Sequence, residues 1–84
     1  MSNSMKNLDK ELRRKLTSSE FNAADRYLED AIFWANKSLE AKSSADEAVT
    51  DKRVRDSLTC AIAELNRKGE RHAANVCDYY KRFF

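Results

Sequence analysis

Residues Asp51–Phe84 read DKRVRDSLTCAIAELNRKGERHAANVCDYYKRFF and carry the most regular apolar pattern in the chain. With 100° of rotation per residue, as in an α-helix, the apolar side chains fall within an arc of roughly 120°. The pattern keeps its phase on both sides of Gly69, where a turn would normally reset it. It therefore predicts one continuous helix, roughly 50 Å long. The stripe consists of Val54, Leu58, Ala61, Ile62, Leu65, Gly69, His72, Ala73, Val76, Tyr79, Tyr80 and Phe83.

The start of a second helix is marked by Thr17-Ser18-Ser19-Glu20. This sequence fits a capping box, in which the first and last residues exchange hydrogen bonds between side chain and backbone. Leu16 and Phe21 stand where a hydrophobic staple would pair them across the cap. The apolar face that follows covers roughly half of the helix circumference, so we expect this helix to contact more than one neighbour.

These patterns predict an all-α protein, either an antiparallel helical hairpin or a three-helix arrangement of one short and two long helices. Because Met5, Leu8, Leu12 and Leu16 recur at spacings of three and four, they predict the short helix. The expected organisation is a frayed segment over residues 1–4 and a single domain over 5–84, with helices near 5–16, 18–41 and 51–83. Whether residues 42–50 form a turn or continue a helix stays open, because the stretch has neither glycine nor proline.

Pairing the two long helices from the turn outward places Leu39 opposite Val54 and Phe21 beside His72. Residues 73–84 then project beyond the second helix, and the short first helix is about long enough to cover them. The second apolar face, around Tyr27 and Trp34, stays open in this arrangement. We therefore expect a second copy of the chain, or another protein, to complete a larger bundle.

The charge of the chain is segmented. Residues 1–17 carry five bases and two acids, residues 18–41 carry two bases and five acids, and residues 51–84 carry eight bases and five acids. Acidic and basic arms favour antiparallel packing against each other over binding of a polyanion. The longest apolar run, Ala31–Ala35, is far short of the ~20 residues that cross a bilayer. We expect a cytoplasmic protein that makes no membrane contact.

Little in the sequence supports catalysis. His72, the one histidine, lies within the stripe and is expected to be packed. Cys60 and Cys77 would be about 25 Å apart on one helix, too far for a disulfide, and are expected to be inert, partly buried thiols. No zinc site can be assembled from one histidine and two distant cysteines, and one glycine cannot make a phosphate loop. We expect no enzyme activity, metal or cofactor.

The sequence is most typical of a small interaction protein, such as a regulator, inhibitor, adaptor or chaperone-like subunit, that presents a helical face to a partner protein or to itself. Phe33 breaks the helical pattern, because it stands among polar residues on its helix. It is either a singly exposed aromatic or an anchor for a partner. The other partner-contact candidates are Tyr27, Trp34, Tyr80 and Phe84. The less favoured alternative is nucleic-acid binding through phosphate contacts, for which the candidates are Arg13, Arg14, Lys15, Arg53, Arg67 and Arg71.

Overall fold

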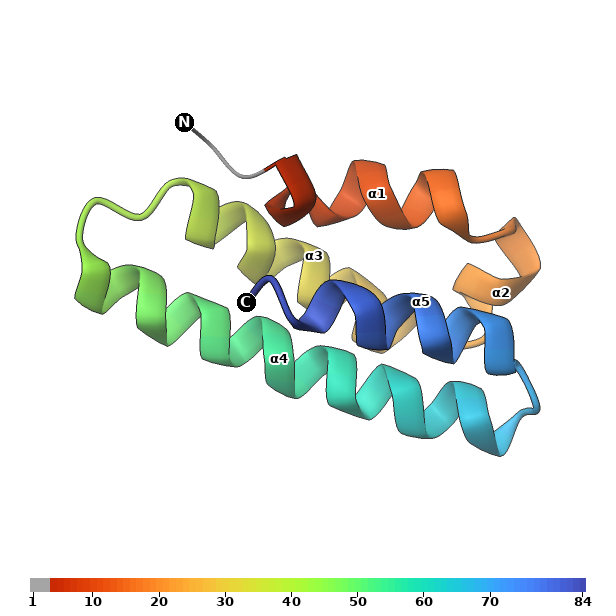
Figure 1. Ribbon diagram of the computed structural model, residues 1–84. Helices are drawn as coiled ribbons and strands as arrows, with labels where there is room; N and C mark the ends of the chain where they lie inside the picture. The colour runs from red at the N-terminus through yellow and green to blue at the C-terminus, as the bar shows by residue number, and fades with distance from the viewer. Residues whose placement is uncertain (1–3) are drawn as a thin grey trace.

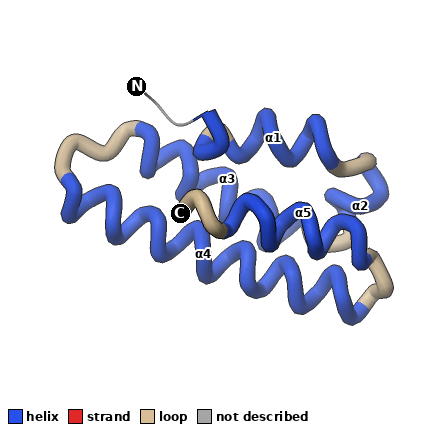
Figure 2. Tube along the Cα trace, viewed as in Figure 1, coloured by secondary structure: helices blue, strands red, loops and turns tan. Residues whose placement is uncertain are grey.

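The computed structural model describes residues 4–84, which form helices and no strand (Figures 1 and 2). The predicted all-α class is confirmed. The predicted fraying concerns residues 1–4, of which residues 1–3 lie outside the described residues. In chain order the elements are a 3-10 turn η1 (Ser4–Lys6), α1 (Leu8–Lys15), α2 (Ser18–Asn22), α3 (Asp25–Leu39), α4 (Ser44–Arg67) and α5 (Arg71–Lys81).

Four of the helices, α1, α3, α4 and α5, run in alternating directions along the same axis (Figure 1). Each packs against the next in this order, and α5 returns to contact α1, so the four close into a ring. The short α2 is the turn that joins α1 to α3. Up-down-up-down connectivity of this kind needs only short links between antiparallel neighbours.

The predicted continuous helix over residues 51–83 is wrong, because the chain reverses at Gly69. Gly69 has φ +78°, a left-handed conformation that is accessible to glycine at little cost. The Glu70 N–H donates to the Leu65 carbonyl at 2.8 Å, and the Gly69 N–H donates to the Asn66 carbonyl at 3.1 Å. These two bonds are those of a Schellman motif, which closes a helix by satisfying its last carbonyls. The longest dimension of the folded residues 4–84 is therefore only 38 Å.

The capping box that was predicted before the second helix is present. The Thr17 hydroxyl accepts a hydrogen bond from the Glu20 N–H at 3.1 Å, and the Thr17 N–H donates to Glu20 Oε1 at 2.8 Å. The predicted helix over 18–41 is wrong in its continuity, because it breaks at Ala24, whose φ and ψ are −141° and 34°. Lys68 at the end of α4 donates to the Ala23 carbonyl at 2.7 Å, so a tertiary contact satisfies a backbone group that the break leaves free.

The open question about residues 42–50 is answered by α4, which begins at Ser44 and includes most of this stretch. Ser43 caps it, accepting a hydrogen bond from the Asp46 N–H at 3.1 Å. The turn between α3 and α4 is correspondingly short. The register also differs from the prediction, because Ser38 donates to Asp51 Oδ1 at 2.5 Å, and Leu39 is an exposed side chain instead of a partner of Val54.

The core runs through the middle of the ring and draws on every α-helix. On α4 it uses the predicted positions, every third or fourth residue. On α5 the buried face is rotated by roughly 90° from the predicted stripe, at 100° per residue, because α5 packs between α4 and α1. The buried apolar residues are Leu8, Leu12, Leu16, Phe21, Ala24, Leu28, Ala31, Ile32, Ala35, Val54, Leu58, Ala61, Leu65, Ala73, Ala74, Cys77 and Tyr80.

Candidate functional site

An aromatic pair stands at the surface of α3 and forms the first candidate site. The Phe33 side chain is 52% exposed, and its ring meets the Trp34 ring edge-on, with centroids 5.1 Å apart. A cation flanks each ring: Lys37 Nζ lies 5.5 Å from the Phe33 centroid, and the Arg53 guanidinium on α4 lies 5.3 Å from the Trp34 ring. We call these four residues the Phe33 patch. Such contacts favour one orientation of each ring.

The other predicted partner-contact residues are less available. Tyr27 and Trp34 are half-buried and pack against the core. Phe84 is also half-buried, with Lys6 Nζ 5.6 Å from its ring centroid, and Arg55 donates to its carbonyl. Tyr80 is only 1% exposed, so its prediction as a partner contact is wrong. Because α5 folds back beneath α1, this side chain lies inside the protein.

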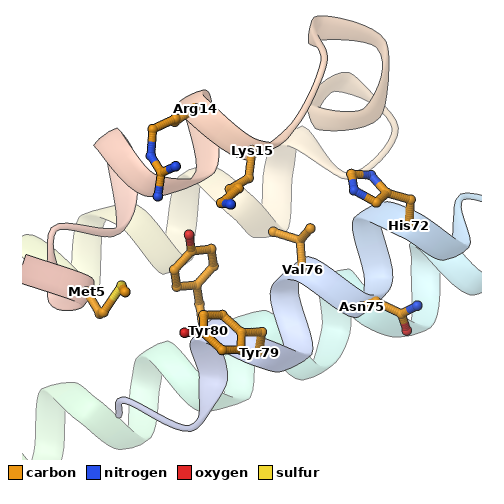
Figure 3. Close-up of a pocket in the computed structure, with 8 residues that line it drawn as sticks. All are labelled: Met5, Arg14, Lys15, His72, Asn75, Val76, Tyr79 and Tyr80. Carbon is orange, nitrogen blue, oxygen red and sulfur yellow. The ribbon is translucent and has the colours of Figure 1, made fainter.

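A groove between α1 and α5 forms the second candidate site, which sequence reasoning missed because it depends on the reversal at Gly69. Its volume is about 390 Å³. Figure 3 shows Arg14 and Lys15 reaching from α1 toward α5, with His72 at one end and Met5 near the other. We call this the α1/α5 groove. It is lined by Met5, Arg14, Lys15, His72, Asn75, Val76, Tyr79 and Tyr80.

A hydrogen-bond network under the groove ties its walls together. The Tyr80 hydroxyl donates to Glu11 Oε1 at 2.7 Å, and Arg14 Nη2 donates to the same oxygen at 2.7 Å. The Tyr80 bond and then the Arg14 bond lower the pKa of Glu11 below its ordinary value of 4.5. Burial, followed by the bond to Glu11, raises the pKa of Tyr80 to about 12. The charged carboxylate and the neutral phenol are thus the forms that hold α1 on α5.

His72 is exposed at the end of the groove, so its prediction as a packed residue is wrong. Its side chain is 68% exposed, and Nδ1 lies 2.9 Å from Glu20 Oε2. The Thr17 N–H and then His72 lower the pKa of Glu20. The residue that was expected beside His72 was Phe21, which follows Glu20 in the chain. The capping box therefore also fixes the start of α5.

The two cysteines lie in different surroundings, and both are free thiols. Cys60 is exposed on α4, contrary to the prediction of partial burial, whereas Cys77 is fully buried in the core. Burial raises the pKa of Cys77 to about 12, which keeps it a neutral thiol at physiological pH. Within residues 4–84, no three His, Cys, Asp or Glu residues gather as metal ligands would.

The residues predicted for nucleic-acid binding are all exposed, but they face different neighbours. Arg13 donates to Asp9 at 3.0 Å and to Glu29 of α3 at 3.1 Å. Arg14 and Lys15 line the α1/α5 groove instead, on another side of α1. Arg53 stands over the ring of Trp34. At the far end of α4, Arg67 pairs with Glu64 at 2.8 Å, and Arg71 begins α5.

Neither a protein-family model, nor a curated protein, nor a solved structure matches this chain. None of the helices in residues 4–84 combines the length and the apolar character that crossing a membrane requires.

Proposed function

We propose that this protein is a small, non-enzymatic interaction module that docks a partner protein through the Phe33 patch. The observation that carries the proposal is the 52% exposure of Phe33 beside a half-buried tryptophan. Burying the exposed half of a phenylalanine side chain stabilises a complex by roughly 1 kcal/mol. We assign the module to the cytoplasm, because both cysteines are free thiols and reducing compartments keep them so.

The chemistry of the patch supports a protein partner. Tryptophan and arginine are enriched among the residues that dominate binding energy at interfaces, and here Arg53 lies over the Trp34 ring. The edge-on contact between Phe33 and Trp34 holds both rings in place before any partner arrives. Binding then loses less side-chain entropy than it would with mobile rings.

The surface charges support a protein partner more than a nucleic acid. Several exposed cations of the helices are already paired with carboxylates of this chain, among them Arg13, Lys52 and Arg67. Phosphate contacts would have to compete with these pairs. Among the groups that could serve as nucleophile or base, Cys77 is buried and His72 lies against Glu20. Cys60 is an exposed thiol on α4, whereas the one histidine of the chain is on α5.

The first partner to test is a second copy of the chain. Sedimentation velocity at micromolar concentration is expected to show an associating wild-type protein. Phe33→Ala is expected to weaken association by roughly fivefold, the ratio that corresponds to about 1 kcal/mol. Val49→Ala is the matched control, because Val49 is an exposed apolar side chain outside the patch. Trp34→Ala is a poorer probe, because Trp34 also packs against the core.

If the wild type is a monomer, the same variants are compared as baits in extracts of the native host. A partner retained by the wild type and by Val49→Ala but lost by Phe33→Ala supports the proposal. Equal recovery of every partner by Phe33→Ala and wild type, with no self-association, contradicts it. Circular dichroism and urea unfolding of each variant confirm that the fold is intact.

A further inference from the structure

We propose that the α1/α5 groove binds an extended acidic segment of a partner protein. In this arrangement carboxylates of the segment bind Arg14 and Lys15, and an apolar or aromatic side chain packs on Val76 and Tyr79. The groove is built by α1 and α5, whereas the Phe33 patch lies on α3 and α4. The two sites therefore use different residues, and either can fail without the other.

The charge of the groove is the first argument. None of the residues that line it is acidic, while Arg14 and Lys15 lie next to each other on one wall (Figure 3). The nearby carboxylate of Glu11 is already hydrogen-bonded to Tyr80 and Arg14. Lys15 has no ion-pair partner in the described part of the chain. Since a guanidinium has five N–H donors, Arg14 can hold Glu11 and still bind a second carboxylate.

The apolar residues of the groove are the second argument. Because the buried face of α5 is rotated from the predicted stripe, Val76 lies partly buried at the edge of the core and Tyr79 is exposed, both on the groove side. Tyr79 is 42% exposed. Its ring makes edge-on contacts with the rings of Tyr80 and Phe83, whose centroids lie 5.2 Å and 5.4 Å from its own. A fixed, half-exposed aromatic ring beside cations suits a ligand that is both apolar and anionic.

The length of the groove fits a short peptide. His72 and Tyr79 are seven residues apart on α5, which corresponds to about 10 Å of helix. An extended peptide covers the same distance with about three residues. Asn75 lies between them and offers both a donor and an acceptor to a peptide backbone.

A nucleic acid fits this groove less well. Backbone phosphates are bound by several cations in series, but the next cation along α1, Arg13, faces α3 and pairs with Asp9 and Glu29. Two adjacent cations above an apolar floor favour a single acidic cluster with an apolar neighbour.

The test is a titration of the isotope-labelled full chain with a blocked hexapeptide of alternating glutamate and phenylalanine. NMR spectra of the protein are recorded at each addition of peptide. Saturable shifts are expected at the end of α1 and along residues 72–80. Lys15→Glu is expected to weaken binding roughly tenfold, the effect of losing one charge-assisted hydrogen bond. Lys42→Glu is the matched control, since Lys42 is an exposed lysine between α3 and α4 that does not line the groove; it should weaken binding by less than about threefold.

Three results overturn the proposal. One is the absence of saturable shifts at millimolar peptide. Another is equal weakening by Lys42→Glu and Lys15→Glu, which would mean attraction by net charge alone. The third is equal binding of a peptide with lysine in place of glutamate.

A single-stranded oligothymidylate is titrated in parallel. Shifts of the groove residues by the oligothymidylate but not by the acidic peptide would replace the proposal with a nucleic-acid site. Phe33→Ala should leave peptide binding unchanged, which keeps this test separate from that of the Phe33 patch.

Discussion

Replacing Tyr80 by phenylalanine removes one oxygen from the contact that holds α1 on α5. The Tyr80 hydroxyl donates to Glu11 Oε1 at 2.7 Å inside the protein, and a hydrogen bond to a charged group contributes about 1.5–3 kcal/mol. Glu11 keeps its bond to Arg14 at 2.7 Å, so the carboxylate is not left without a partner. We therefore expect Tyr80→Phe to lower the free energy of unfolding by about 1–2 kcal/mol, toward the lower end of that range.

The measurement is urea unfolding followed by far-ultraviolet circular dichroism. The midpoint should fall while the slope with urea stays unchanged, because the surface exposed on unfolding is nearly the same. Tyr79→Phe is the matched control: it removes the same atom from a neighbouring tyrosine that is 42% exposed. Its hydroxyl makes no hydrogen bond within residues 4–84, so its effect should stay within about 0.5 kcal/mol.

A double-mutant cycle with Glu11→Gln isolates the interaction between the two side chains. A coupling energy near zero, or equal destabilisation by Tyr79→Phe and Tyr80→Phe, would refute the reasoning. An absorbance titration gives a second readout, since the pKa of Tyr80 is raised to about 12. The late phenolate transition should disappear in Tyr80→Phe. Because the pKa is raised, the stability due to the neutral phenol is present below pH 10.0 and is lost as pH rises toward about 12.

Two further predictions concern the turn at Gly69 and the acid limb of stability. Gly69→Ala should lower the free energy of unfolding by about 1 kcal/mol, the cost of a left-handed alanine. No steric clash adds to this cost, because a Cβ at position 69 meets no atom within 4 Å. Unchanged urea stability would show that the left-handed turn does not limit the fold. Glu11 and Glu20 have lowered pKa values, so their contributions are present above pH 4.5 and are lost as pH falls below it. Glu20→Gln keeps a side chain that can complete the capping box and should make the urea midpoint less sensitive to acid. An acid dependence identical to that of the wild type would exclude Glu20, with its contacts to the Thr17 N–H and His72, as its source.

Local signals in the sequence predicted the parts of the fold that depend on neighbouring residues. The capping box at Thr17 and Glu20 was predicted correctly, because its hydrogen bonds span only three residues. The apolar positions of α4 were also predicted, because any helix with that spacing presents them on one face. The helix end at Gly69 had a signal as well, since Arg67, Lys68 and Gly69 are typical of a helix C-terminus. The continuous phase of the stripe outweighed that signal.

The candidate sites differ in how far sequence alone could find them. Phe33 was identified because it is an aromatic residue at a polar position of its helix, and the structure places it at the surface beside Trp34. Tyr80 was assigned to the surface because it was placed on a projecting helix end. The α1/α5 groove could not be predicted, because Lys15 and Tyr79 are brought together only by the reversal of α5.

Local sequence signals are enough to establish that this chain is helical, where α2 begins, and which side of α4 faces the core. These properties follow from capping and from apolar periodicity, both of which act over one or two turns of helix. The tertiary structure alone decided that the last helix turns back at Gly69, that α3 breaks from α2 at Ala24, and that Tyr80 is buried while Tyr79 is exposed. The physical reason is that the buried face of α5 is chosen by two neighbours, α4 and α1, and their positions depend on contacts between residues far apart in the chain.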